Sequence, residues 1–120
     1  MKKVNILLVD DHELFRSGLR RILQERDDLV VVDEAASGED ALVKVRKKLP
    51  DLVLMDINMP GLGGMETIRR LQRMHPELPV IAVTILNDGP FPSRLLDAGA
   101  RGFVTKGDSA DELFLSLIHI

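Results

Sequence analysis

The stretch ILLVDD at residues 6–11 decides the fold, because it carries an apolar run directly into two acids. The run from Val4 to Val9 is typical of a strand buried on both faces of a parallel sheet. Asp10 and Asp11 follow at once, and Glu13 comes close behind. Neighbouring carboxylates repel one another and are costly to desolvate, so their placement at the end of a core strand requires a chemical reason.

Similar apolar runs recur along the chain and alternate with amphipathic segments. Further strands are predicted over Leu29–Val32, Leu52–Met55, Val80–Thr84 and Gly102–Thr105. Each is followed by a predicted helix, so the pattern is βα repeated five times. This alternation predicts an α/β fold, with a doubly wound parallel five-stranded sheet covered on both faces. No repeat, low-complexity stretch or linker divides the chain, which indicates one domain over residues 1–120.

The first two predicted helices carry apolar residues at helical spacing and local signals for their ends. Ser37, with Asp40 three residues later, suits the start of the second helix, and Pro50 closes it. The first helix should bury one face, made of Leu14, Phe15, Gly18, Leu19, Ile22 and Leu23.

The later helices are predicted in the same way. The third runs from about Met65 to Met74, and a short fourth carries Leu95 and Leu96 inward. Ser109 with Glu112 opens the last helix, which completes the fifth βα unit.

The composition argues against several classes of function. The chain has 120 residues, 45% of them apolar, and no cysteine. One globular core is therefore expected, without disulfides or thiolate metal sites. A net charge of −3 and a pI of about 5.6 argue against direct nucleic-acid binding, which needs a basic face. No apolar stretch approaches membrane-spanning length, so we expect a cytoplasmic protein without membrane contact.

Polar side chains stand at the ends of four predicted strands. In open α/β sheets, ligands bind in the crevice beyond the carboxyl ends of the strands. We therefore expect the residues in these positions to converge on one pocket. They are Asp10, Asp11, Asp56, Thr84 and Lys106.

Clustered carboxylates favour a hard divalent cation and would repel the phosphates of a dinucleotide. Mg²⁺ takes oxygen ligands, usually one or two carboxylates with waters and substrate phosphate. Lys106 offers a point charge for a phosphate oxygen, and the Thr84 hydroxyl can hydrogen-bond another. Because a carboxylate can also accept a phosphoryl group, the set predicts phosphoryl transfer.

Each of these residues alone also has an ordinary explanation. Acids favour helix N-termini, and Asp56 suits a turn. Lys106 suits a solvated surface and Thr84 an ordinary strand position. Their joint placement, in the same position on successive strands, favours the functional interpretation. His12 is expected not to be a metal ligand, because hard cations prefer oxygen.

The sequence resembles a bacterial response-regulator receiver domain over essentially its whole length. The matching pieces are LLVDD at 7–11, LVLMDINMPGLGG at 52–64, AVT at 82–84 and GFVTK at 102–106. The stretch DDHELFRSGLRRIL at 10–23 resembles the NarL/FixJ class, and DGPFPSRLLDAGARGFVTKG at 88–107 is similar to the GacA/UvrY/LetA group. The resemblance implies a flavodoxin-like receiver fold with strand order 2-1-3-4-5.

The resemblance also implies a role for the acids. Asp56 would be the phospho-acceptor, supplied by a sensor histidine kinase or a phosphotransfer domain. Mg²⁺ would be held by Asp10, Asp11, Asp56 and the backbone carbonyl of Asn58. The side chains that tune hydrolysis would be Asn58 and Leu86.

The remaining site residues would form the switch. Lys106 would bind the phosphoryl group, Thr84 would move toward it, and Phe103 would follow. The domain would catalyse only its own slow phosphorylation and dephosphorylation, so it would not be an enzyme. Its output would be transcription, through a C-terminal helix-turn-helix domain that these residues do not contain. DNA contact would come only from that domain, and phosphorylation would favour a homodimer.

Some features depart from the family pattern. Gly107 stands where many receivers have proline after the lysine. Pro90 and Pro92 are expected to shorten or stiffen the start of the fourth helix. The apolar end LFLSLIHI, residues 113–120, is expected to lie in a protein contact.

Two other functions remain open on the sequence alone. The first is a small Mg²⁺-dependent phosphatase that forms an aspartyl phosphate. Such hydrolases need a second acid to protonate the leaving group, and Asn58 cannot do this. The second is an inactive receiver that serves as a binding scaffold, against which the complete set of acids, threonine and lysine argues.

Overall fold

The computed structural model describes residues 3–59, 61–84 and 91–106, without the side chains of residues 91 and 92. Strands and helices alternate along the chain, as predicted. The elements are β1 Val4–Val9, α1 Glu13–Leu23, β2 Leu29–Ala35, α2 Gly38–Lys47, β3 Leu52–Asp56, α3 Gly64–Met74, β4 Val80–Thr84, α4 Phe91–Ala98 and β5 Gly102–Thr105. The predicted fifth helix, Leu86, Pro90, Gly107 and the apolar C-terminal stretch lie outside the described residues.

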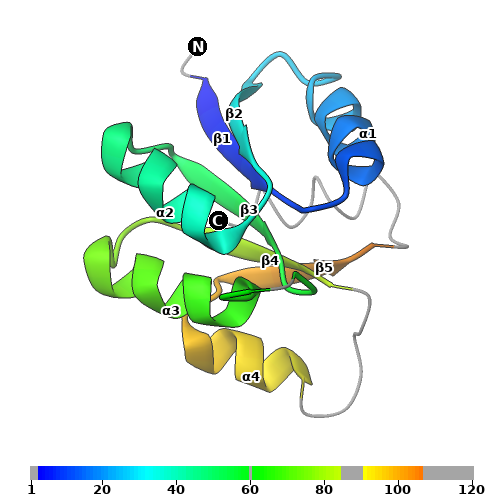
Figure 1. Cartoon of the computed structure of the whole chain (residues 1–120). Coiled ribbons are helices and arrows are strands. Elements are labelled where there is room, and N and C mark those ends of the chain that lie inside the picture. The colour runs from blue at the N-terminus through cyan, green and yellow to red at the C-terminus, as the bar shows by residue number, and fades with distance from the viewer. Residues whose placement is uncertain (1–2, 60, 85–90, 107–120) are drawn as a thin grey trace.

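The strands form one parallel sheet in the order β2-β1-β3-β4-β5. This confirms the predicted doubly wound fold and its strand order. Among the described helices, α1 covers one face of the sheet, whereas α2, α3 and α4 cover the other (Figure 1). None of the helices in the described part of the chain is long and apolar enough to cross a membrane.

Alternate residues of each strand build two separate cores. In β1, Leu7 and Val9 belong to the core beneath α2, α3 and α4. Ile6 and Leu8, between them, belong to the core beneath α1. Because a strand buried on both faces needs apolar residues at every position, β1 is a continuous apolar run.

The second strand extends to Ala35, further than predicted, and contains a β-bulge. The pairing shifts between Ile6, which faces Val31, and Leu7, which faces Asp33. One extra residue, Val32, reverses the alternation of faces along β2. Val31 therefore packs beneath α1, whereas Ala35 packs on the opposite side of the sheet. The same shift pairs Glu34 with Leu8, on the α1 side.

The predicted inward faces of two helices were partly wrong. Leu14 is 88% exposed and Gly18 is exposed, so the buried face of α1 is narrower than expected. Consecutive residues of a helix are about 100° apart, and the sheet already contacts the side of α1 that carries Phe15. For the same reason Leu95 is fully buried on α4, while Leu96 is 51% exposed.

The start of α2 agrees with the sequence pattern. Ser37 is its N-cap, and the Ser37 hydroxyl accepts a hydrogen bond of 3.0 Å from the Asp40 amide. The end of the helix is basic, as its dipole favours. Pro92 lies in the first turn of α4, where proline costs no helical hydrogen bond.

Candidate functional site: an acidic pocket at the strand ends

The structure brings the predicted strand-end side chains together. Asp10 follows β1, Asp56 ends β3, and both are buried. Lys106 follows β5, and its Nζ lies 3.5 Å from Asp10 Oδ2 and 3.4 Å from Asp56 Oδ1. Parallel strands place their carboxyl ends at one edge of the sheet, which is why residues from both ends of the chain meet here.

Asp56 has one satisfied oxygen and one open oxygen. Asp56 Oδ1 accepts a hydrogen bond of 3.0 Å from the Asn58 amide, whereas Oδ2 is buried and has no hydrogen-bond partner. Burial raises the pKa of Asp56, and the nearby charge of Asp10 raises it further. The hydrogen bond from the Asn58 amide and the charge of Lys106 lower the pKa of Asp56. An unpartnered buried carboxylate oxygen is costly unless a ligand comes to it.

Asp10, in the loop after β1, also has one hydrogen-bonded and one unbonded carboxylate oxygen. The Asp10 amide donates to the carbonyl of Ala35, and Asp10 Oδ1 accepts a 2.7 Å bond from the His12 amide. Asp10 Oδ2 is buried and makes no hydrogen bond, since its contact with Lys106 is a longer ion pair. Asp11 is more exposed, and its Oδ1 lies 3.4 Å from His12 Nδ1.

These groups have the spacing of a cation site. One ligand atom from each of four side chains can be chosen so that all lie within 4.8 Å of one another; the four are Asp10, Asp11, His12 and Asp56. The acids supply the oxygen ligands that hard divalent cations take. The open, buried oxygens of Asp10 and Asp56 show that this part of the pocket is suited to such an ion.

The other predicted residues lie around the acids. Thr84 is buried at the end of β4, and its carbonyl accepts a 2.7 Å hydrogen bond from the Lys106 amide. Asn58 is exposed, two residues beyond Asp56. Phe103 is on β5 and packs against the core beneath α2, α3 and α4. Phe103 thus belongs to the core next to the site and not to the acid cluster.

Two residues of α1 contribute to the site although the sequence did not predict them. The ring of Phe15, assigned only to the core, lies 4.7 Å from Lys106 Nζ, at cation–π distance. Arg16 Nη1 donates a 2.5 Å hydrogen bond to the carbonyl of Asp10. Arg16 Nε also donates to Glu34 Oε1 at 2.7 Å, and Arg20 binds the other oxygen of Glu34. Side-chain contacts between different helices and strands leave no periodic pattern in a single sequence, so these contacts could not be predicted.

A glycine turn places the start of α3 beneath Asp56. Gly63, the N-cap, has a φ of +79°, which glycine adopts without strain. Gly64 begins the helix so close to β3 that a Cβ there would lie 2.2 Å from the carbonyl oxygen of Asp56. The glycines of this loop therefore set the position of the acid.

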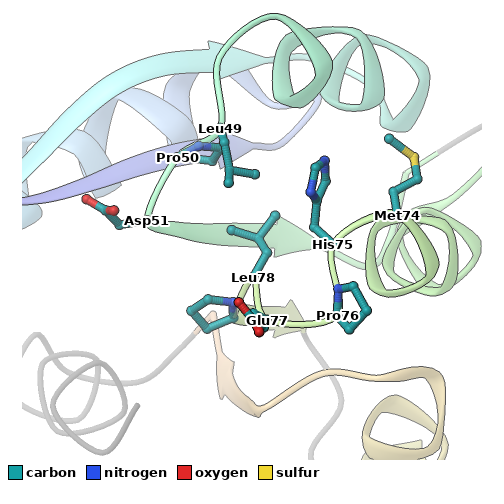
Figure 2. Close-up of a pocket in the computed structure, with 9 residues that line it drawn as sticks. Leu49, Pro50, Asp51, Met74, His75, Pro76, Glu77 and Leu78 are labelled. Atoms are coloured by element: carbon teal, nitrogen blue, oxygen red, sulfur yellow. The ribbon is translucent and has the colours of Figure 1, made fainter.

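A hollow of about 410 Å³ lies at the other end of the strands (Figure 2). Its lining comes from the segments that lead into β3 and β4, with Leu49, His75 and Leu78 among its residues. It contains none of the predicted site residues. Size alone does not identify the functional site here, because the clustered charges are elsewhere.

Fold and site together define a doubly wound α/β domain with an acidic, cation-suited pocket at its strand ends. The family model of the response regulator receiver domain matches residues 6–118. The chain belongs to this family and is the receiver of a two-component response regulator, a signalling domain and not a conventional enzyme.

The relatives agree with this assignment. The response regulator GacA of Pseudomonas viridiflava is 51% identical over 92% of this chain, and UvrY of Escherichia coli K12 is 44% identical over the same share. The chain spans about half the length of these two relatives, 51% and 50%. A LuxR-family response regulator from an Aurantimonas species has a TM-score of 0.93 and 34% identity, over 98% of this chain and 84% of that one.

Proposed function

We propose that Asp56 accepts a phosphoryl group from a sensor histidine kinase or a phosphotransfer domain. The single observation that carries this proposal is the open oxygen of Asp56, which is buried beside a lysine and without a hydrogen-bond partner. A carboxylate nucleophile needs a free oxygen and a nearby positive charge for the incoming phosphate. Both features meet at this position.

Mg²⁺ fits the oxygen ligands of the pocket. Asp10, Asp11, Asp56 and the backbone carbonyl of Asn58 would hold it, and it would neutralise charge on the phosphoryl oxygens. The open oxygens of Asp10 and Asp56 support this assignment, since each lacks a hydrogen-bond partner in a buried place.

The chain's own residues then perform the transfer. An oxygen of Asp56 attacks phosphorus, and the P–N bond of the donor phosphohistidine breaks with its electron pair left on the imidazole nitrogen. Lys106 binds a phosphoryl oxygen, after leaving its ion pairs with Asp10 and Asp56. Asp10 keeps its own position through the hydrogen bond that its backbone amide donates to the carbonyl of Ala35.

The output is a shift between two conformations. Phosphoryl oxygens bind the Thr84 hydroxyl only when Thr84 moves toward them, and this differential contact favours the active state. Phe103 lies partly buried on β5, the neighbour of β4, from where it follows Thr84.

The wider role belongs to the same proposal. Residues 1–120 form the receiver, and a C-terminal helix-turn-helix domain of the full-length protein contacts DNA to regulate transcription. Phosphorylation favours a homodimer, and the protein works in the cytoplasm. The names of the curated relatives, which are response regulators about twice as long, support this view.

Intact mass after incubation with Mg²⁺ and acetyl phosphate tests the proposal. We expect wild type to gain one phosphoryl group and Asp56→Asn to gain none. Asp51→Asn is the matched control, because Asp51 is an exposed acid at the other end of β3. It should be phosphorylated like wild type.

Other outcomes point to the other functions. Gain by Asp56→Asn would overturn the assignment of the acceptor. Steady turnover of a phosphomonoester that Asp56→Asn abolishes would indicate a phosphatase. Mg²⁺ binding without any mass gain would indicate a binding scaffold.

A further inference from the structure

We propose that the acidic pocket also binds borderline transition cations, such as Co²⁺ and Ni²⁺, with the His12 imidazole as an added nitrogen ligand. This inference rests on the proposed function, because it assigns a second class of cation to the same pocket. It leaves the Mg²⁺ ligands as they are.

The position of the His12 ring carries the inference. His12 Nδ1 lies 3.4 Å from Asp11 Oδ1 and 3.7 Å from Asp10 Oδ1. Together with an oxygen of Asp56, the four ligand atoms lie within 4.8 Å of one another. Ligands on opposite sides of a small divalent ion stand about 4.2 Å apart, twice a bond of about 2.1 Å. Small side-chain movements therefore bring all four onto one ion.

A second observation shows that the pocket is open to a ligand. The Asp56 side chain is 0% exposed, and its Oδ2 has no hydrogen-bond partner. The His12 side chain is 69% exposed and can turn without disturbing the core. The pocket thus combines a fixed, buried oxygen with an adjustable nitrogen.

Ligand chemistry separates the two classes of cation. Mg²⁺ prefers oxygen and gives up its water reluctantly, so it gains little from an imidazole. Co²⁺ and Ni²⁺ bind imidazole well, and affinity rises from Mn²⁺ to Cu²⁺ along the first transition row. Loss of His12 should therefore weaken the transition cations and leave Mg²⁺ unchanged.

Calorimetric titration of the metal-free protein tests this difference. Wild type, His12→Asn, Asp56→Asn and His75→Asn are each titrated with Mg²⁺, Co²⁺ and Ni²⁺ at about pH 8, where an ordinary imidazole is neutral. His75→Asn is the matched control, because His75 lines the hollow at the other end of the strands. We expect His12→Asn to weaken Co²⁺ and Ni²⁺ by at least the roughly 10–100-fold that loss of a ligand-supporting group costs. The visible spectrum of bound Co²⁺ should change in the same variant only.

The outcomes separate this inference from the proposed function. Unchanged Co²⁺ and Ni²⁺ affinity in His12→Asn overturns the inference, and so does an equal loss for all three cations. If acetyl phosphate adds a phosphoryl group to wild type and not to Asp56→Asn, the proposed function stands in either case. If Asp56→Asn leaves every affinity unchanged, the cations bind elsewhere, and both this inference and the Mg²⁺ site assigned under the proposed function fail.

Discussion

Asp56 is held where its charged form is disfavoured. Burial and the charge of Asp10 raise its pKa above the ordinary 3.8, and the Asn58 amide and Lys106 only oppose this. A raised pKa in the folded state means that the protonated form stabilises the fold. This contribution is present at acid pH and is lost as pH rises through the folded-state pKa.

Asp56→Asn should therefore stabilise the metal-free protein at neutral pH, because the amide removes an unfavourable buried charge. The gain over wild type should shrink as pH falls through the raised pKa and disappear near the ordinary value of 3.8. Urea unfolding of both proteins in a chelator, over this pH range, measures the difference. A gain that stays constant with pH would show that desolvation of the charge is not its cause.

Alanine substitutions at Gly64 and Gly18 test how closely α3 approaches β3. Gly64→Ala should lower the free energy of unfolding by about 1–3 kcal/mol, the usual cost of overpacking, because its Cβ meets the backbone of Asp56. Gly18→Ala, inside α1 with no atom within 4 Å of a Cβ, should raise it by about 0.5–1 kcal/mol. Denaturant unfolding measures both. Similar changes of the same sign would contradict the close approach of α3 to β3.

The sequence predicted some residues of the site and missed others, for a physical reason. Asp10, Asp56 and Lys106 were predictable because each directly follows or ends an apolar strand, and parallel strands share one functional edge. Phe15 and Arg16 were not, because their partners lie on other elements. Apolar periodicity assigned Phe15 to the core correctly but gave no sign of its contact with Lys106.

At the scale of elements, the bulge in β2 connects α1 to the acidic pocket. It turns Glu34 to the α1 side, where Arg16 binds both Glu34 and the Asp10 carbonyl. The Arg16 side chain is only 16% exposed and that of Glu34 is 23% exposed. This pair is therefore better shielded from solvent than most surface ion pairs.

Arg16→Met should lower the free energy of unfolding by about 1.5–3 kcal/mol, the range for hydrogen bonds to charged groups. It should also weaken Mg²⁺ binding, because the carbonyl of Asp10 loses its hydrogen bond from Arg16. Arg70→Met is the matched control, since Arg70 binds Glu66 on the exposed side of α3 and should cost less than about 1 kcal/mol. Unfolding curves and Mg²⁺ titrations of both variants measure these effects. Equal losses of stability and Mg²⁺ affinity in the two variants would contradict the proposed support of the Asp10 loop by Arg16.

Element types were predicted more reliably than their edges and faces. The end of β2 was missed because the segment beyond Val32 is acidic, and only its pairing with β1 reveals it as strand. Leu14 and Leu96 were misplaced because apolar character alone does not fix which side of a helix meets the sheet. Both errors arise from tertiary contacts that override local pattern.

For the whole molecule, cation binding and unfolding should be linked. The proposed ligands lie directly after β1 and at the end of β3, so the site exists only in the folded domain. Mg²⁺ at about 100 times its Kd should therefore stabilise the protein by about 2.7 kcal/mol. Calorimetry and circular dichroism, which suit a chain without Trp or Tyr, should report the same rise in Tm. Asp10→Asn should reduce this rise, and an equal rise in that variant would place the cation elsewhere.

The distance along the chain between Asp10 and Lys106 has a consequence for protein synthesis. A growing chain that has left the ribosome only as far as β4 carries Asp10 and Asp56 but lacks β5 and its lysine. Such a chain has carboxylates that repel one another and lacks the Lys106 ammonium group that contacts both Asp10 and Asp56. If Asp56 is the acceptor, as proposed above, a donor should meet a complete site only when β5 has joined the sheet, so the signal would pass to finished domains and not to fragments.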